Sequence, residues 1–72
     1  MKKMFVICYE AIDINYAFEC VSEVFITDFD SILKTAKKYA SFSTISSVII
    51  YEAKINEGNG QIIPGELVKK VK

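Results

Sequence analysis

The sequence contains no histidine, arginine or tryptophan, and all nine of its basic residues are lysines. Histidine is the usual general base near neutral pH, and arginine is the residue that clamps phosphate and carboxylate groups with paired hydrogen bonds. No cluster of the remaining residues has the spacing of a catalytic, metal or phosphate site. The sequence therefore predicts a protein that is not an enzyme and that has no cofactor and no metal ligands.

Cysteine is scarce as well, and long apolar runs are missing. Two cysteines are too few for a disulfide scaffold or a four-thiolate zinc site. The apolar run at residues 4–9 is too short for the core of a secretion signal, and no stretch has the length of a transmembrane helix. We therefore expect a cytoplasmic, reduced protein with no membrane contact.

Neither sign of charge predominates, since nine acidic residues balance the nine lysines. This balance argues against nucleic acid as a direct partner. The distribution is uneven: residues 4–33 hold six acids and no base, whereas residues 34–72 hold seven lysines and three acids. The chain is thus predicted to carry an acidic side and a basic side.

Leucine is also rare, and β-branched residues replace it. Isoleucine and valine total 17 against two leucines, which favours pleated sheet over a helix bundle. Seventy-two residues make one small domain, residues 1–72, with a thin core. Residues 4–9 are all apolar or aromatic, as expected of a central strand that is covered on both faces.

A hairpin is expected after this first strand. Residues 13–15 supply a turn, and an extended segment runs from Tyr16 to about Ile26. A three-residue turn would place Cys8 opposite Cys20. We expect these two cysteines to be buried free thiols, and a cross-strand disulfide is the alternative.

The best-defined signal is a helix over residues 29–41. Asp28 is a good N-cap, Asp30 places a negative charge in the first turn, and apolar residues follow at helical spacing. A polar connection at 42–47 leads into a strand at 48–55.

A second hairpin should close the chain. Residues 56–60 form a Gly- and Asn-rich turn, and residues 61–63 form the return strand, which Pro64 and Gly65 are expected to break. Residues 66–72 are predicted as a short strand, with a helical turn or a frayed end as alternatives.

The predicted fold is α+β, of the type ββαββ, with one helix on a four- to five-stranded antiparallel sheet. A right-handed crossover would place the first strand between the second and the third. One helix covers one face, so the other should present an apolar patch that marks an interface. We expect the patch to contain Phe5, Ile7, Tyr9, Val21 and Phe25, with Val48 and Ile50; the alternate set is Met4, Val6, Cys8, Phe18, Cys20, Val24 and Ile26.

The layout of strand, cap and helix over residues 23–39, followed by the strand at 48–52 and a Gly-rich hairpin, resembles small phage-encoded ββαββ proteins, some of them anti-CRISPR inhibitors. The resemblance is one of pattern over most of the chain and carries over no functional residue. It implies a non-enzymatic protein that acts in the host cytoplasm by binding and blocking a larger complex.

The leading hypothesis is a binding module that docks a larger protein or protein–nucleic-acid complex, as an inhibitor would. The anchors would be Tyr9, Tyr16 and Phe25, and Glu19 and Glu23 would steer towards a basic surface. One alternative is a homodimer whose open sheet face is the interface. Another is a domain that binds a small ligand.

Overall fold

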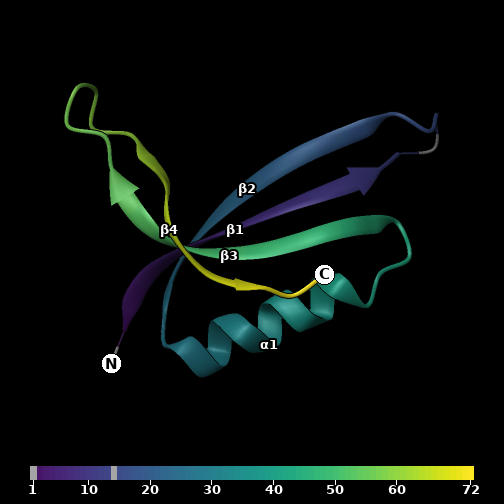
Figure 1. The fold of residues 1–72 in the computed structure, drawn as a ribbon, viewed down its shortest axis with the longest axis horizontal. Helices are drawn as coiled ribbons and strands as arrows, with labels where there is room; N and C mark the ends of the chain where they lie inside the picture. Colours follow the sequence, from purple (N-terminus) through teal and green to yellow (C-terminus); the bar gives the residue numbers. More distant parts are fainter. Residues whose placement is uncertain (1, 14) are drawn as a thin grey trace.

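The computed structural model of the chain describes residues 2–13 and 15–72, which form four strands and one helix (Figure 1). In chain order these elements are β1 (Lys3–Ile12), β2 (Phe18–Thr27), α1 (Phe29–Ala40), β3 (Ile45–Ile55) and β4 (Ile62–Lys70). The predicted ββαββ order is confirmed.

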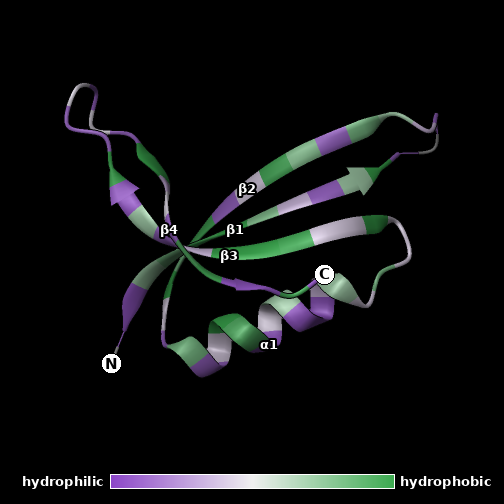
Figure 2. Cartoon of the chain, in the orientation of Figure 1, coloured by the Kyte–Doolittle hydropathy of each residue, from purple (hydrophilic) through white to green (hydrophobic). Residues whose placement is uncertain are grey.

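The four strands form one sheet in the order β2-β1-β3-β4, with every neighbouring pair antiparallel. β1 therefore lies between β2 and β3, as predicted. Its central position explains the unbroken apolar run, because Phe5, Val6 and Ile7 are all buried although they alternate between the two faces. Figure 2 shows the hydrophobic stretches of β1 and β3 meeting in the middle of the sheet.

The helix forms where the sequence predicts it and ends one residue earlier, at Ala40. The Asp28 side chain caps it by accepting a hydrogen bond from the Ser31 backbone N–H at 2.8 Å. This bond lowers the pKa of Asp28, because it favours the charged carboxylate. Ile32 and Ala36 are fully buried and face the sheet.

The core lies between α1 and one face of the sheet. Its largest fully buried side chains include Ile7 from β1, Ile32 from α1, and Val48 and Ile50 from β3. Val68 in β4 packs against this cluster at its margin. The core is small, so each of these side chains makes a large contribution to stability.

The first hairpin differs from the prediction in its register. Ile12 pairs with Phe18, so the hairpin turn is wider than predicted, and Cys8 lies opposite Ser22 rather than Cys20. The reason is local: the Asp13 carboxylate accepts hydrogen bonds from the backbone N–H groups of residues 15 and 17, at 2.8 and 3.0 Å, and closes a wider turn. Ile14 of the predicted turn lies outside the described residues. Both cysteines are free, and Cys20 is exposed rather than buried.

β4 also differs, because it runs from Ile62 to Lys70 without the expected break at Pro64 and Gly65. The predicted return strand and the predicted terminal strand are one strand, so the sheet has four strands. β4 is an edge strand with two register shifts against β3, and proline is tolerated at such an edge. A side chain at Gly65 would place its Cβ 2.8 Å from the Glu52 carbonyl oxygen, so the close approach of the strands needs a glycine there.

Candidate functional site

The helix covers the face of the sheet that we had expected to be open. Phe5 and Ile7 belong to the buried core beneath α1, and Tyr9 and Phe25 pack against that core. Because both faces of the first hairpin are apolar, the alternation of its residues could not decide which face the helix takes. The structure therefore corrects the first assignment and leaves the alternate set of residues uncovered.

The uncovered surface, here called the open face, is formed by alternate residues of β1, β2 and β3, together with β4 residues that pair with them. Glu10 is the only charged side chain that β1, β2 and β3 contribute to it. From β4, Leu67 lies opposite Tyr51, and Lys70 lies opposite Ile49. The members from the first three strands are Met4, Val6, Cys8, Glu10, Ile12, Phe18, Cys20, Ser22, Val24, Ile26, Ser47, Ile49, Tyr51, Ala53 and Ile55.

Large apolar side chains on the open face are strongly exposed. The exposed fraction is 66% for Phe18, 68% for Ile26 and 57% for Leu67. Val6, by contrast, lies between Val24 and Tyr51 in the middle of the face and is fully buried. The open face thus has a closed, well-packed centre and an apolar surface around it, as expected of a surface that becomes buried in a complex.

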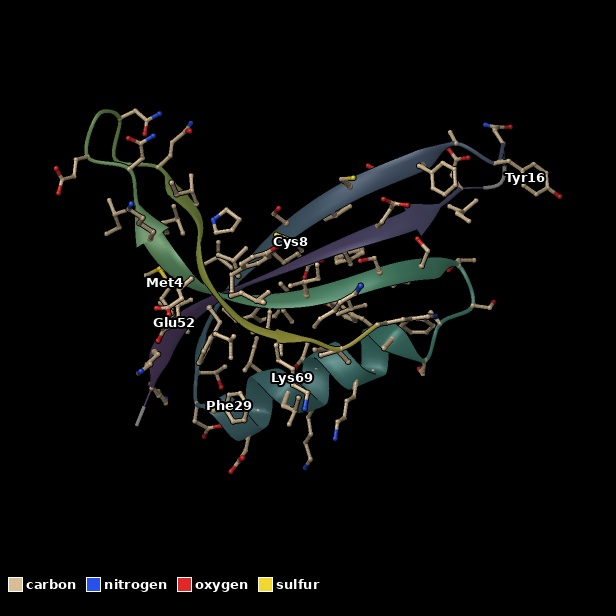
Figure 3. The ribbon with its side chains drawn as sticks, in the orientation of Figure 1. Met4, Cys8, Tyr16, Phe29, Glu52 and Lys69 are labelled. Carbon is tan, nitrogen blue, oxygen red and sulfur yellow. The ribbon has the colours of Figure 1, made fainter. Side chains whose placement is uncertain are left out.

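A shallow depression of about 240 Å³ lies on the open face between β2, β1 and β3. Cys8, Cys20, Ser22 and Ile49 are among its lining residues. The Cys8 sulfur lies 3.4 Å from the Ser22 hydroxyl oxygen, which orients both side chains across the first hairpin. In Figure 3, Cys8 lies in the middle of the sheet, well away from the hairpin tip at Tyr16. The depression can receive a small apolar side chain of a partner.

Glu23, expected to steer a partner, is held beneath the sheet on the side of the helix. Its two carboxylate oxygens accept hydrogen bonds from the Tyr9 hydroxyl at 2.9 Å and from the Tyr39 hydroxyl at 2.8 Å. The two tyrosine rings meet edge to face with centroids 5.2 Å apart. This arrangement, called the tyrosine clamp below, links β1, β2 and α1.

The tyrosine clamp shifts the acidity of both phenols. The hydrogen bond to Glu23 is the main cause that raises the pKa of Tyr9. Burial, followed by the hydrogen bond to Glu23, raises the pKa of Tyr39 to about 12. Both phenols therefore stay neutral and keep donating at physiological pH. Tyr39 was not predicted as part of any site. Helical spacing places it on the side of the helix that faces the sheet, and this was the signal in the sequence that could have identified it.

The five predicted contact residues do not form one surface. Tyr9, Glu23 and Phe25 lie on the covered face. Glu19 is exposed on β2 opposite Ala11, also on the helix side. Tyr16 is 86% exposed at the tip of the first hairpin, with a positive φ of 61°. A partner bound to the open face would therefore not contact Tyr9, Glu23 or Phe25. Tyr16 could contact such a partner only at the edge of the interface.

A second hollow of about 280 Å³ lies between the start of the helix and the sheet. Phe5, Phe29 and Val68 line it, and the ion pair between Lys3 and Glu52, at 3.1 Å, stands beside them. Figure 3 shows Phe29 at the first turn of α1. Within residues 2–13 and 15–72 there is no cluster of three side chains that could hold a metal ion, and no helix is long and apolar enough to cross a membrane.

Comparisons with known proteins add no relative: no family model, no curated protein and no solved structure matches the chain. The resemblance to small phage-encoded proteins therefore stays a prediction. The candidate site rests on the geometry of the open face alone.

Proposed function

We propose that this chain is a protein-binding module that docks a larger protein on the open face of its sheet. The observation that carries the proposal is the group of large apolar side chains left exposed there, above all Phe18, Ile26 and Leu67. Scattered exposed apolar residues are normal on a protein surface, but these share one face of one sheet. Covering them would stabilise the complex by roughly 25 cal/mol for each Å² of apolar surface removed from water.

The chemistry of the partner follows from the same surface. A matching surface would be apolar at its centre, because β1, β2 and β3 contribute no charge to the open face except Glu10. Glu10 and Lys70 stand on the face with opposite signs, so a partner would need a base near the first and an acid near the second. Such charges select the orientation of a partner more than they add affinity.

The more specific form of this proposal is a phage-encoded inhibitor that blocks a larger nucleic-acid-processing complex in the host cytoplasm. Its support is the resemblance in size and layout to small phage-encoded ββαββ proteins. A module of this kind would act by occupying a surface that the complex needs, without chemistry of its own. The corrected placement of Glu23 moves the expected contacts from the acidic hairpin to the apolar open face.

The test compares two substitutions that place the same charge on exposed apolar positions. Leu67→Asp lies on the open face, and Phe42→Asp lies in the connection between α1 and β3, away from that face; the side chains are 57% and 46% exposed. Because both are exposed, we expect each to change the free energy of unfolding by no more than about 1 kcal/mol. Both variants should therefore fold.

Tagged wild-type chain and both variants would be expressed in the natural host and isolated with their partners after mild cross-linking. We expect one defined partner to be captured by the wild type and by Phe42→Asp, and at least tenfold less of it by Leu67→Asp. Equal capture by all three would refute docking on the open face. Light scattering on the purified chains, without cross-linking and without partner, detects the alternative, a homodimer through the open face, as a two-chain mass that Leu67→Asp halves.

A further inference from the structure

The two edges of the sheet are built differently. β4 carries Pro64, two register shifts and, near its end, Lys69 and Lys70. Proline, bulges and charged side chains, above all lysine, are among the devices by which natural edge strands avoid pairing with other chains. β2 has no proline, glycine or lysine and follows β1 in one unbroken register; its two charges, Glu19 and Glu23, lie on the helix side of the sheet.

The backbone of β2 also presents a regular row of groups at its free edge. Two hydrogen bonds at the end of β1 show which residues bond to which neighbour. The Asp13 N–H donates to the Ala17 carbonyl, on the β2 side, at 3.0 Å, whereas the Ile12 N–H donates to the Thr44 carbonyl, on the β3 side, at 2.8 Å. Opposed residues in an antiparallel ladder alternate between bonded and unbonded pairs. The odd-numbered residues of β2 therefore bond to β1. The even-numbered residues direct their N–H and C=O groups outward, namely Phe18, Cys20, Ser22, Val24 and Ile26.

We propose that this edge pairs with the β2 edge of a second copy of the chain. The two strands would run antiparallel about a two-fold axis at Ser22 and join the two sheets into one, with both helices on the same side. Because the two-fold axis is perpendicular to the sheet, each β2 residue lies opposite a residue of the second copy whose side chain is on the same face of the joined sheet. Pairings that are slipped by one residue are excluded, because they would turn every side chain of one copy to the wrong face.

Charge and length select the axis at Ser22. An axis at Glu23 would oppose the two Glu23 side chains directly, and an axis at Val21 would oppose Glu19 to Glu23; both juxtapositions are destabilising. With the axis at Ser22, Glu19 lies opposite Phe25 of the second copy and Glu23 lies opposite Val21. The tyrosine clamp also turns the Glu23 carboxylate back towards its own sheet.

The same axis pairs the exposed apolar residues of β2. Phe18 falls opposite Ile26 of the second copy, and Cys20 falls opposite Val24. Phe18 and Ile26 are 66% and 68% exposed in the single chain, so the pairing sets the two most exposed apolar side chains of the strand side by side, and they stay on the open face of the joined sheet. An axis at Cys20 shortens the paired segment and leaves Ile26 without a residue opposite it. An axis at Val24 does the same to Phe18.

A cysteine at Ser22 tests this register directly. In a Cys8→Ala, Cys20→Ser background, Ser22→Cys puts two thiols opposite each other on the axis, with Cα atoms about 5.5 Å apart, within the range of a disulfide. The matched control is Val24→Cys in the same background. Its thiols would lie about 13 Å apart, four residues out of register. After mild oxidation at about ten micromolar, we expect a covalent dimer from Ser22→Cys and at least tenfold less from Val24→Cys.

Ser22→Pro supplies the non-covalent test, because it removes an outward N–H and leaves the bonds to β1 in place. By light scattering we expect a two-chain mass for the wild type and a one-chain mass for Ser22→Pro, with unchanged circular dichroism. A one-chain wild type up to about a hundred micromolar, or equal cross-linking of the two cysteine variants, would refute the proposal. If Ser22→Pro does not fold, the cysteine comparison decides alone. These substitutions change residues of the open face, so they are measured on the purified chain without a partner and report self-association alone. Leu67→Asp should keep the two-chain mass of the wild type, which separates pairing at the β2 edge from a homodimer through the open face.

Discussion

The tyrosine clamp predicts a specific loss of stability when one of its hydroxyl groups is removed. Tyr39→Phe keeps the ring and its edge-to-face contact with Tyr9 but deletes the hydrogen bond of 2.8 Å to Glu23. A hydrogen bond to a charged group contributes roughly 1.5–3 kcal/mol, and Glu23 keeps the bond from Tyr9 at 2.9 Å. We therefore expect the free energy of unfolding to fall by about 1–2 kcal/mol at pH 7.5, measured by urea denaturation.

The same substitution should change how stability depends on alkaline pH. In the folded chain the pKa of Tyr39 is about 12, whereas its ordinary value is 10.0. A raised pKa means that the stabilisation is fully present below pH 10 and is lost as the pH rises from 10 to 12, because only the unfolded chain then ionises readily. By pH 11 the wild type should have lost on the order of 1 kcal/mol through this residue, because solvent around the partly exposed side chain screens part of the effect, and Tyr39→Phe should lack this loss.

The control is Tyr51→Phe, which removes a tyrosine hydroxyl from the open face, outside the clamp. It should leave the free energy of unfolding at pH 7.5 within about 0.5 kcal/mol of the wild type. If Tyr39→Phe were as stable as Tyr51→Phe at pH 7.5, and if both lost stability equally between pH 9 and pH 11, the clamp would not contribute to the fold as described.

Two further predictions concern the helix cap and the β4 edge. Asp28→Ala should lower the melting temperature by a few degrees at neutral pH, because the hydrogen bond that caps the helix at Ser31 is lost. The fold lowers the pKa of Asp28 from its ordinary value of 3.8, so the carboxylate stabilises the fold above that value. In thermal melts the difference in melting temperature between wild type and Asp28→Ala should therefore vanish as the pH falls from 3.8 through the pKa of the folded chain. Gly65→Ala should destabilise the chain by roughly 1–3 kcal/mol in urea denaturation, because its Cβ would lie 2.8 Å from a β3 carbonyl oxygen. Gly58→Ala, whose nearest contact is 3.3 Å away on a side chain, is the control and should cost clearly less.

The elements of this fold could be predicted because their signals are local. The helix has an N-cap at Asp28, a negative first turn and apolar residues at helical spacing, and all of these act within a few residues. The central position of β1 could also be predicted, since a run of apolar residues indicates a strand with neighbours on both sides: Phe5 and Ile7 are buried under the helix, and Val6 is buried between Val24 and Tyr51 on the other face.

The features that escaped prediction depend on contacts between distant segments. Which face of the first hairpin lies under α1 is decided by how the helix crosses the sheet, and both faces of that hairpin are apolar enough to accept it. The register depends on one side chain, because the Asp13 carboxylate binds the backbone N–H groups of residues 15 and 17 and closes a wider turn than the three residues expected. The continuity of β4 through Pro64 depends on its place at the edge of the sheet.

The candidate site shows the same division. An apolar open face could be inferred from one helix and two apolar hairpin faces, but its members could not be chosen. Tyr9 and Glu23 looked like contact residues because aromatic and acidic side chains are typical of interfaces. Their actual partner, Tyr39, comes from the helix, sixteen residues after Glu23.

Protection of Cys8 tests the central claim most directly, because this thiol lines the depression on the open face and is one strand away from the free edge. In a Cys20→Ser background, its rate of alkylation would be measured for the purified chain and for the chain in complex with its captured partner. Lys34→Cys, at an exposed position on α1 in a Cys8→Ala, Cys20→Ser background, is the control. We expect Cys8 to react at least tenfold more slowly in the complex while the cysteine at position 34 reacts at an unchanged rate. An unchanged rate at Cys8 would show that the partner binds elsewhere and would contradict the assignment of the open face.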